Sequence, residues 1–319
     1  MSDYIKYRFP NQDIVEKTGL FSEIKLDELD KGFFVSSFQG DKTFSFTENN
    51  SDFHFHLKSD RPEVYTEKEY LFKASEFLNR IKVLDLKKAI FSRVKCVDFD
   101  TSKIEELFSK LEESYPNSLV YLISSKLFGT WIGASPEILL ESENEISKTI
   151  SLAGTKTIDD DSGWTEKEIL EQNYVTEFIE SKLQKIGLSE LNRSETIEIS
   201  AGPVKHLRTE FSWVKNSSKE KQILKELHPT PAVSGYPRQE ALKLISEIET
   251  HERELYSGMI GYLDGNSTSV YVNLRCCQIQ SNNAYLYLGG GFTMDSDINS
   301  EWQETENKSK TLLNIIEKL

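Results

Sequence analysis

The sequence lacks the features that are typical of membrane-spanning, secreted or cysteine-bound metal proteins. No apolar run approaches the ~20 residues that a membrane-spanning helix needs, and the first residues, MSDYIKYRFP, do not resemble a signal peptide. The three cysteines, Cys96, Cys276 and Cys277, lack metal-ligand spacing, and the adjacent pair would point to opposite faces of a strand. We therefore expect reduced thiols, a cytoplasmic location and no membrane partner.

Basic residues are also in short supply. Lys and Arg number 38 against 52 Asp and Glu, which gives a formal net charge of −14. Such a chain has no cationic surplus to neutralise phosphates, so we expect no nucleic-acid partner and no anionic membrane surface. The protein can still bind a small anion where a metal ion or a few placed Lys and Arg supply positive charge.

The chain is long enough, at 319 residues, to bury a full core without staples. Helix-like and strand-like segments alternate with neither repeats nor a linker, which predicts one interwoven α+β domain over residues 1–319. Residues 1–60 form its short N-terminal β region and residues 61–319 its main core.

Two early segments look like strands. The pattern GFFVSSFQGDKTFSF (32–46) predicts a hairpin with Gly40 and Asp41 at its turn. The pattern FHFHL (53–57) alternates as a strand does and would place two histidines on one face. A metal site there would need a third ligand, and none is nearby.

A possible base and a possible acid lie on strand-like segments. Lys88 begins the apolar run LKKAIFSRVKCVDF, where it either snorkels outward or is held in a site; the spacing alone favours snorkelling. Glu137 follows a bend at Ser135 and Pro136 in FGTWIGASPEILLES (128–142), a predicted β-hairpin. Apolar neighbours would raise the pKa of Glu137 and suit it to donate a proton, whereas a strand-edge carboxylate facing water is the alternative.

Two predicted helices each carry a pair of glutamates three residues apart. Thr165 and Glu168 make a capping box for a helix that extends to about Ile186, and Glu171 lies one turn further on. The alternative for such a pair is a solvated surface with its own ion pairs.

The second helix begins near Ser300, a good N-cap residue, and places Glu301, Glu304 and Lys308 on one face. The two pairs could face one another across a cation. Oxygen ligands without His or Cys suit Mg²⁺ better than zinc.

Glycines and an arginine precede this second helix. Residues 284–288 predict a strand, and the glycines Gly289–Gly291 that follow allow a sharp turn or a close approach to a ligand. Residues 253–265 and 269–280 predict a hairpin, and Arg275, embedded in its second strand, should point at an anion.

Seven blocks occur in the order found in one enzyme family. They are FGTWIGASPEILL, SLAGT, VKHLRT, LHPTPAVSG, RELYSGMIGY, VNLRC and GGGF…SEWQETENKSKTLL, and they extend from about Lys82 to the C-terminus. The chain resembles the chorismate-utilising enzymes, and within them the isochorismate synthases most closely. The resemblance implies an α/β sandwich of largely antiparallel sheets flanked by helices, with one active site.

The resemblance also implies residue roles. Lys88 corresponds to the general base and Glu137 to the general acid. Glu171 and Glu304 correspond to direct Mg²⁺ ligands, with Glu168 and Glu301 beside them. The positions that correspond to the substrate site are Thr155, His206, Ala232, Tyr256, Leu274, Arg275, Gly289, Gly291 and Lys308.

The implied reaction converts chorismate, a dianion, into isochorismate, and is formally an isomerisation by intramolecular hydroxyl transfer. Water activated by Lys88 attacks C2 while Glu137 protonates the leaving C4 oxygen on the opposite face. Lys88 must be neutral and Glu137 protonated, which burial favours. Mg²⁺ would bridge the ring carboxylate to the glutamates, and Arg275 could bind the other carboxylate.

Related reactions stay open as alternatives. Salicylate synthases also eliminate pyruvate and tend to have threonine where this chain has Ala232. Anthranilate and aminodeoxychorismate synthases add ammonia from a glutaminase partner, and the latter typically carry a lysine where this chain has Ala153. We expect a monomer without a glutaminase, serving menaquinone biosynthesis or, alternatively, a catechol siderophore. An inactive chorismate- or cation-binding relative is the non-enzyme alternative.

Some positions depart from the family pattern. Gln172 stands where histidine is usual, GGGF replaces AGAGI, KSKTLL replaces KLSTL, and the N-terminal part is short. None of these changes removes a proposed catalytic or metal-binding group.

Overall fold

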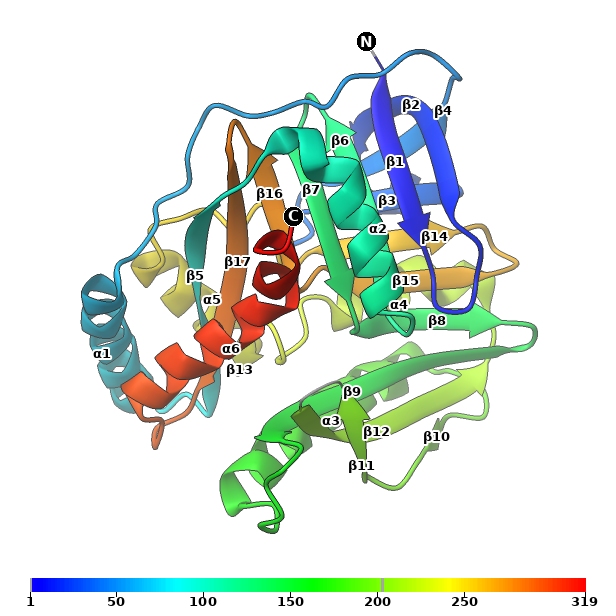
Figure 1. Ribbon diagram of the computed structural model, residues 1–319. Coiled ribbons are helices and arrows are strands. Elements are labelled where there is room, and N and C mark those ends of the chain that lie inside the picture. The colour runs from blue at the N-terminus through cyan, green and yellow to red at the C-terminus, as the bar shows by residue number, and fades with distance from the viewer. Residues whose placement is uncertain (1, 202–203) are drawn as a thin grey trace.

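The computed structural model describes residues 2–201 and 204–319, with only the backbone of Thr155, Thr157, Ala201 and Val204. Within these residues, seventeen strands form one continuous antiparallel ladder that folds into two arms (Figure 1). The arms meet at the β3–β4 hairpin.

The first arm has the pairing order β13-β5-β17-β16-β7-β6-β1-β2-β4. Its strands are β1 (Asp3–Arg8), β2 (Val15–Ile24), β4 (Thr43–Glu48), β5 (Lys88–Asp98), β6 (Leu119–Ser125), β7 (Gly129–Ser135), β13 (Gly235–Tyr236), β16 (Cys276–Gln280) and β17 (Asn283–Phe292).

The second arm has the order β3-β14-β15-β8-β9-β12, and the short strands β10 and β11 pair with β12. Its strands are β3 (Gly32–Ser36), β8 (Ile138–Glu143), β9 (Ile146–Thr157), β10 (Asn192–Arg193), β11 (Ile197–Ala201), β12 (Val204–Val214), β14 (Met259–Leu263) and β15 (Thr268–Val272).

Helices cover the outer faces of both arms. They are α1 (Glu67–Leu84), α2 (Ile104–Ser114), α3 (Glu166–Ile186), α4 (Glu220–Leu227), α5 (Arg238–Ile248) and α6 (Ile298–Ile316), with 3₁₀ turns at Leu26–Glu28, Thr101–Lys103 and Ser217–Lys219. An aromatic-rich core that includes Phe33, Trp131 and Tyr287 lies between the arms. Helices α2 and α6 pack outside β6, β7, β16 and β17, whereas α3 and α4 pack on the second arm. The predicted sandwich of antiparallel sheets and flanking helices is therefore confirmed.

Local signals in the sequence were mostly sufficient for the helices and hairpins. The capping boxes at Thr66 and Thr165 both form, and the hairpin at Gly40 forms between β3 and β4. The turn at Asp264 and Gly265 joins β14 to β15.

The predicted strand at residues 53–57 is wrong. Only Phe53 makes an isolated bridge there, because the backbone of His56 bonds to side chains: its N–H donates to the Ser124 hydroxyl at 2.8 Å and its carbonyl accepts from Thr130 at 2.9 Å. Among the described residues, no group of three or more His, Cys, Asp or Glu is arranged to hold a metal ion, there or elsewhere.

The predicted hairpin over residues 128–142 is also wrong. Strand β7 pairs with β6 and β16, whereas β8 pairs with β9 and β15, so the chain passes from the first arm to the second at Pro136. Proline has no N–H to continue a ladder. This crossing places Glu137 at the junction of the two arms.

Candidate active site

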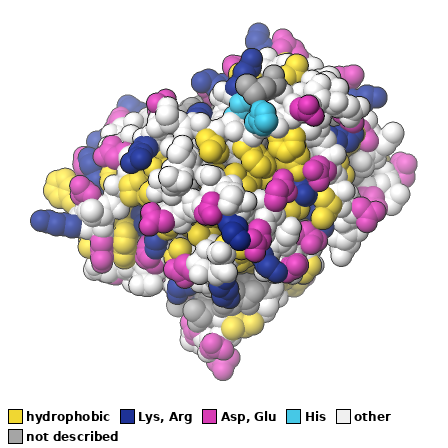
Figure 2. Space-filling model, turned by 45° about the horizontal axis from the view of Figure 1, so that its top comes forward, with side chains coloured by type: hydrophobic (Ala, Val, Ile, Leu, Met, Phe, Trp, Pro, Cys, Tyr) yellow, Lys and Arg dark blue, Asp and Glu magenta, His cyan; other side chains and the backbone are white. Residues whose placement is uncertain are grey.

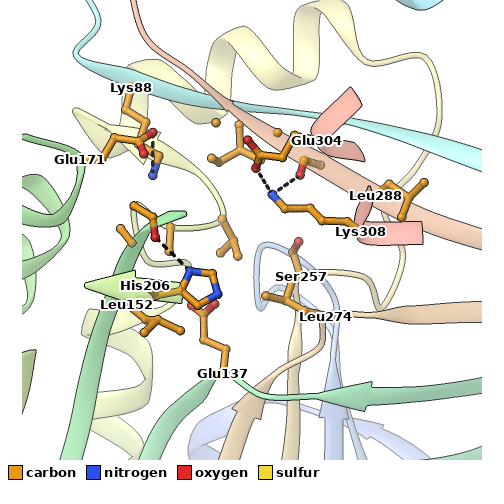
Figure 3. A pocket seen from close by; sticks show the side chains of 18 of the residues that line it. Lys88, Glu137, Leu152, Glu171, His206, Ser257, Leu274, Leu288, Glu304 and Lys308 are labelled. Atoms are coloured by element: carbon orange, nitrogen blue, oxygen red, sulfur yellow. Dashed lines mark hydrogen bonds and ion pairs between the residues drawn. The ribbon is translucent and has the colours of Figure 1, made fainter. Parts of the chain in front are cut away.

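A cavity of about 180 Å³ lies at the junction of the two arms, bordered by α3 and α6 (Figure 3). Most residues singled out from the sequence line it: Lys88, Glu137, Glu168, Glu171, His206, Ala232, Tyr256, Leu274, Arg275, Gly289, Gly291, Glu304 and Lys308. Glu301 is buried behind the cavity wall, and the side chain of Thr155 lies outside the described part of the chain.

Lys88 reaches the cavity from the first residue of β5. Its side chain is only 6% exposed, and its Nζ lies 3.6 Å from Glu171 Oε1. The spacing-based expectation that Lys88 snorkels to solvent is therefore wrong, because pairing of the edge strand β13 with the start of β5 covers this end of the strand. A buried lysine held at a cavity can act on a bound molecule.

Glu137 enters the cavity from the side opposite Lys88 (Figure 3). Its carbonyl accepts a hydrogen bond of 2.9 Å from the Val272 N–H, which fixes the backbone at the crossing between β7 and β8. Burial raises the pKa of Glu137 to about 7, although the positive charges of Lys88, Lys308 and Arg275 oppose the increase. The carboxyl group is therefore protonated in a large fraction of molecules at neutral pH, as a proton donor requires.

Helices α3 and α6 bring carboxylates to the cavity, and each of three carboxylates is next to a lysine. Lys88 lies beside Glu171, Lys308 Nζ lies 2.5 Å from Glu304 Oε1, and Lys167 Nζ lies 3.5 Å from Glu301 Oε1.

Helix α6 is capped by Asp297 rather than by Ser300 as predicted, because the Asp297 side chain accepts a hydrogen bond from the Ser300 N–H.

The two remaining glutamates differ in their surroundings. Glu168 uses Oε2 to accept the Thr165 N–H at 2.8 Å, so its capping role is formed in this structure. Glu301 is 3% exposed; its Oε1 accepts from the Ser296 hydroxyl at 2.8 Å, and its Oε2 has no hydrogen-bond partner. Burial and the neighbouring Glu304 raise the pKa of Glu301 to about 7.

These carboxylates suit a hard divalent cation in chemical type. The donors are all oxygen, no thiol or imidazole lies among them, and Glu301 Oε2 is a buried acceptor that still needs a partner. They are not gathered into a ready-made cluster in the part of the chain that the structure describes. The lysines that now pair with them would have to move aside for a metal ion.

The glycines of β17 make room for these side chains. Of the two alternatives for Gly289–Gly291, the sharp turn does not form, because β17 continues through all three residues in register with Ser92, Phe91 and Ile90. A Cβ at Gly291 would lie 3.1 Å from Lys88 Cε and 3.2 Å from Glu171 Oε1. A Cβ at Gly290 would lie 3.0 Å from Glu301 Oε2.

Positive charge gathers on another side of the cavity. Arg275 lies between β15 and β16, not inside a strand as predicted, and adopts a left-handed backbone with φ of 51°. Its Nη1 donates to the Lys308 carbonyl at 3.2 Å, and Lys308 Nζ donates to the Gly289 carbonyl at 2.9 Å. These contacts hold two cationic groups at the wall, where they can bind the carboxylates of an anion.

His206 comes from β12 and hydrogen-bonds through Nδ1 to the Gly154 carbonyl at 2.9 Å. Since a carbonyl only accepts, Nδ1 carries the proton. Burial lowers the pKa of His206, so the ring is neutral at neutral pH. Gly154 forms a bulge within β9: its φ is +66°, and the register shifts opposite His206 and Leu207.

Lys167 and Ser257 are among the polar residues of the cavity that were missed from the sequence. Lys167 precedes Glu171 by one helical turn, a spacing that could have linked the two. Ser257 is fully buried and has φ of 62°, and only its position next to Tyr256 could have indicated it.

A lysine facing a protonatable glutamate, with cationic groups on one wall and carboxylates on another, defines a pocket for acid–base chemistry on a small anion. The family model for chorismate binding enzymes matches residues 35–317, and the chain therefore belongs to that family.

Isochorismate synthase EntC of Escherichia coli (strain K12) is 32% identical over an alignment of 244 residues, and the match covers 72% of this chain and 62% of that protein. The chain thus matches less than two thirds of the length of this relative. The structure of DhbC from Bacillus anthracis, named as a 2,3-dihydroxybenzoate-specific isochorismate synthase, has a TM-score of 0.82 at 23% identity and covers 99% of this chain and 96% of that chain. The structure of menaquinone-specific isochorismate synthase MenF from Escherichia coli has a TM-score of 0.79 at 20% identity and covers 98% of this chain and 88% of that chain. These two structures show a shared fold.

Proposed function

We propose that the protein is a Mg²⁺-dependent isochorismate synthase that converts chorismate into isochorismate. The observation that carries this proposal is the placement of Lys88 and Glu137 on opposite sides of one cavity. Adding water on one face of a ring while a hydroxyl leaves from the other requires a base and an acid in this relation. The names of the sequence relatives support the same reaction.

In this mechanism Lys88 accepts a proton from water as the water oxygen bonds to C2. The double bonds shift, the C4–O bond breaks, and Glu137 gives its proton to the departing oxygen, which leaves as water. Exchange with solvent returns a proton to Glu137 and removes one from Lys88, so the groups are reset. Arg275 and Lys308 would hold the substrate carboxylates from the cationic wall, and His206 and Tyr256 would border the ring.

Mg²⁺, when bound, would neutralise the ring carboxylate, with Glu171 and Glu304 as ligands and Glu168 and Glu301 beside them. Glu301 Oε2, which lacks a protein partner, is the observation that supports a cation there.

We propose menaquinone biosynthesis as the use of the product. Cells that lack the gene should then lose menaquinone. Loss of a catechol siderophore instead would indicate the alternative pathway.

Salicylate synthase is the second candidate, because pyruvate elimination could follow in the same cavity. Ala232 lines the cavity and leaves this position without a hydroxyl, which favours release of isochorismate.

We would incubate the purified protein with chorismate, with and without Mg²⁺, and separate the products by chromatography. A Mg²⁺-dependent mixture of chorismate and isochorismate would support the proposal. Enzyme-dependent salicylate and pyruvate would favour the second candidate, and unchanged chorismate would contradict both.

A further inference from the structure

Lys167 is a charged residue of the cavity that has no part in the proposed acid–base chemistry. It lies on α3 one turn before Glu171, and its Nζ is 3.5 Å from Glu301 Oε1. We propose that Lys167 is a built-in counter-ion that takes the place of the divalent cation while substrate is absent, so that the cation binds firmly only together with the substrate. This inference rests on the proposed function.

The charges around the cavity are close to balance without any ligand. Four basic side chains line the cavity, namely Lys88, Lys167, Arg275 and Lys308. Four acidic side chains also line it, namely Glu137, Glu168, Glu171 and Glu304, and Glu301 lies directly behind them. A divalent cation alone therefore gains little from entering. A dianionic substrate adds two negative charges, and the cation then restores the balance.

Lys167 contacts the most deeply buried carboxylate beside the proposed cation site, that of Glu301. The ammonium group therefore competes directly with a metal ion for this carboxylate.

Lys167 is also free to leave when a stronger cation arrives. Its side chain is 41% exposed, whereas Glu301 is 3% exposed, so the lysine approaches the buried carboxylate from the solvent side. Swinging outward returns the ammonium to water without a desolvation cost. Lys88, by contrast, is 6% exposed and has no such route.

The test measures Mn²⁺ binding to the full-length protein by electron paramagnetic resonance, without chorismate and then with it. Lys167→Met removes the competing charge, so we expect Mn²⁺ alone to bind about tenfold more tightly than to the wild type. Lys167→Arg keeps the charge and should bind like the wild type. Lys182→Met is the matched control, because Lys182 lies on the same helix but pairs with Glu226 at 2.7 Å, away from the cavity.

Addition of chorismate should tighten Mn²⁺ binding to the wild type more than to Lys167→Met, because Lys88 and Lys308 are present in both proteins and only the wild type must also displace Lys167. Equal or weaker Mn²⁺ affinity in Lys167→Met without chorismate would overturn the inference while leaving the proposed function intact. Absence of Mn²⁺ binding by all four proteins, even with chorismate present, would overturn the proposed metal requirement as well.

Discussion

Lys88 and Glu137 face each other across the cavity, but the sequence pattern predicted the burial of Glu137 and not that of Lys88. The apolar residues after Glu137 indicated burial, and burial does raise its pKa. Lys88 was expected at the surface from spacing alone, because a one-dimensional pattern does not show that β13 covers the start of β5. Its role was indicated only by the family resemblance.

The pKa of Glu137 gives a prediction about pH. The general acid is active when protonated, so activity is highest below a pKa of about 7 and falls as the pH rises through it. With Lys88 already neutral, as the mechanism requires, we expect kcat/KM to decrease by about tenfold per pH unit on this alkaline side. Glu137→Gln should lose at least about a hundredfold in kcat. A wild-type profile that stays flat from pH 6 to 9 would contradict the assignment.

Lys88→Ala should abolish turnover and leave the fold intact, because Lys88 is the only base proposed to activate water. Chromatographic assays give the rate, and circular dichroism melting checks the fold. The neighbouring Lys87, which is half-buried and pairs with Asp85 at 3.0 Å, provides the control, and Lys87→Ala should keep normal activity. Near-normal turnover by Lys88→Ala would refute its role as the base.

At the scale of elements, α3 and α6 carry the four proposed metal-binding glutamates, and the glycines of β17 pack against them. The sequence predicted the helices well, because capping boxes and amphipathic spacing are local signals. It failed where pairing with distant strands decides the outcome: β17 stays extended through its glycines because β5 pairs with it throughout. The crossing between β7 and β8 was missed for the same reason.

Gly291→Ala tests the close packing against β17. The added methyl group would meet Lys88 Cε at 3.1 Å and Glu171 Oε1 at 3.2 Å, so it should displace these two side chains more than it disturbs the core. We expect kcat/KM to fall by about tenfold to a hundredfold. Gly163→Ala is the control, because nothing lies within 4 Å of a Cβ at Gly163. Equal activity of the two variants would show that the glycine is not needed for the site.

Arg93 anchors α6 to β5 from the side away from the cavity. Its Nε donates to Thr305 Oγ1 at 2.8 Å, its guanidinium lies 3.9 Å from the Trp302 ring centroid, and it pairs with Glu306. Because these groups are largely buried, Arg93→Met should lower the free energy of unfolding by about 2 kcal/mol in urea denaturation. Arg80→Met removes an exposed pair with Glu247 and should cost less than about 0.5 kcal/mol. Similar losses in both variants would contradict a special anchoring role for Arg93.

On the scale of the whole molecule, the sandwich architecture explains why one site forms from segments far apart in the chain. Residues from β5, α3, β12 and α6 meet only because the two arms fold over a common core. Only the order of seven motifs indicated this assembly, since periodicity and composition carry no information about which strands adjoin. Acidic and basic side chains are mixed on the face drawn in Figure 2, where the described residues form no continuous basic area. A monomeric state stays a prediction.

The most direct test of the proposed chemistry is the reaction of chorismate with Mg²⁺ and the protein in water enriched in ¹⁸O. Chromatography separates early isochorismate from the remaining chorismate, and mass spectrometry then gives the mass of each. Because water activated by Lys88 must supply the new hydroxyl, the isochorismate should be two mass units heavier than chorismate, which corresponds to about one ¹⁸O per molecule. Isochorismate of unchanged mass would contradict water addition and indicate transfer of the original hydroxyl. Absence of isochorismate altogether would contradict the proposed function.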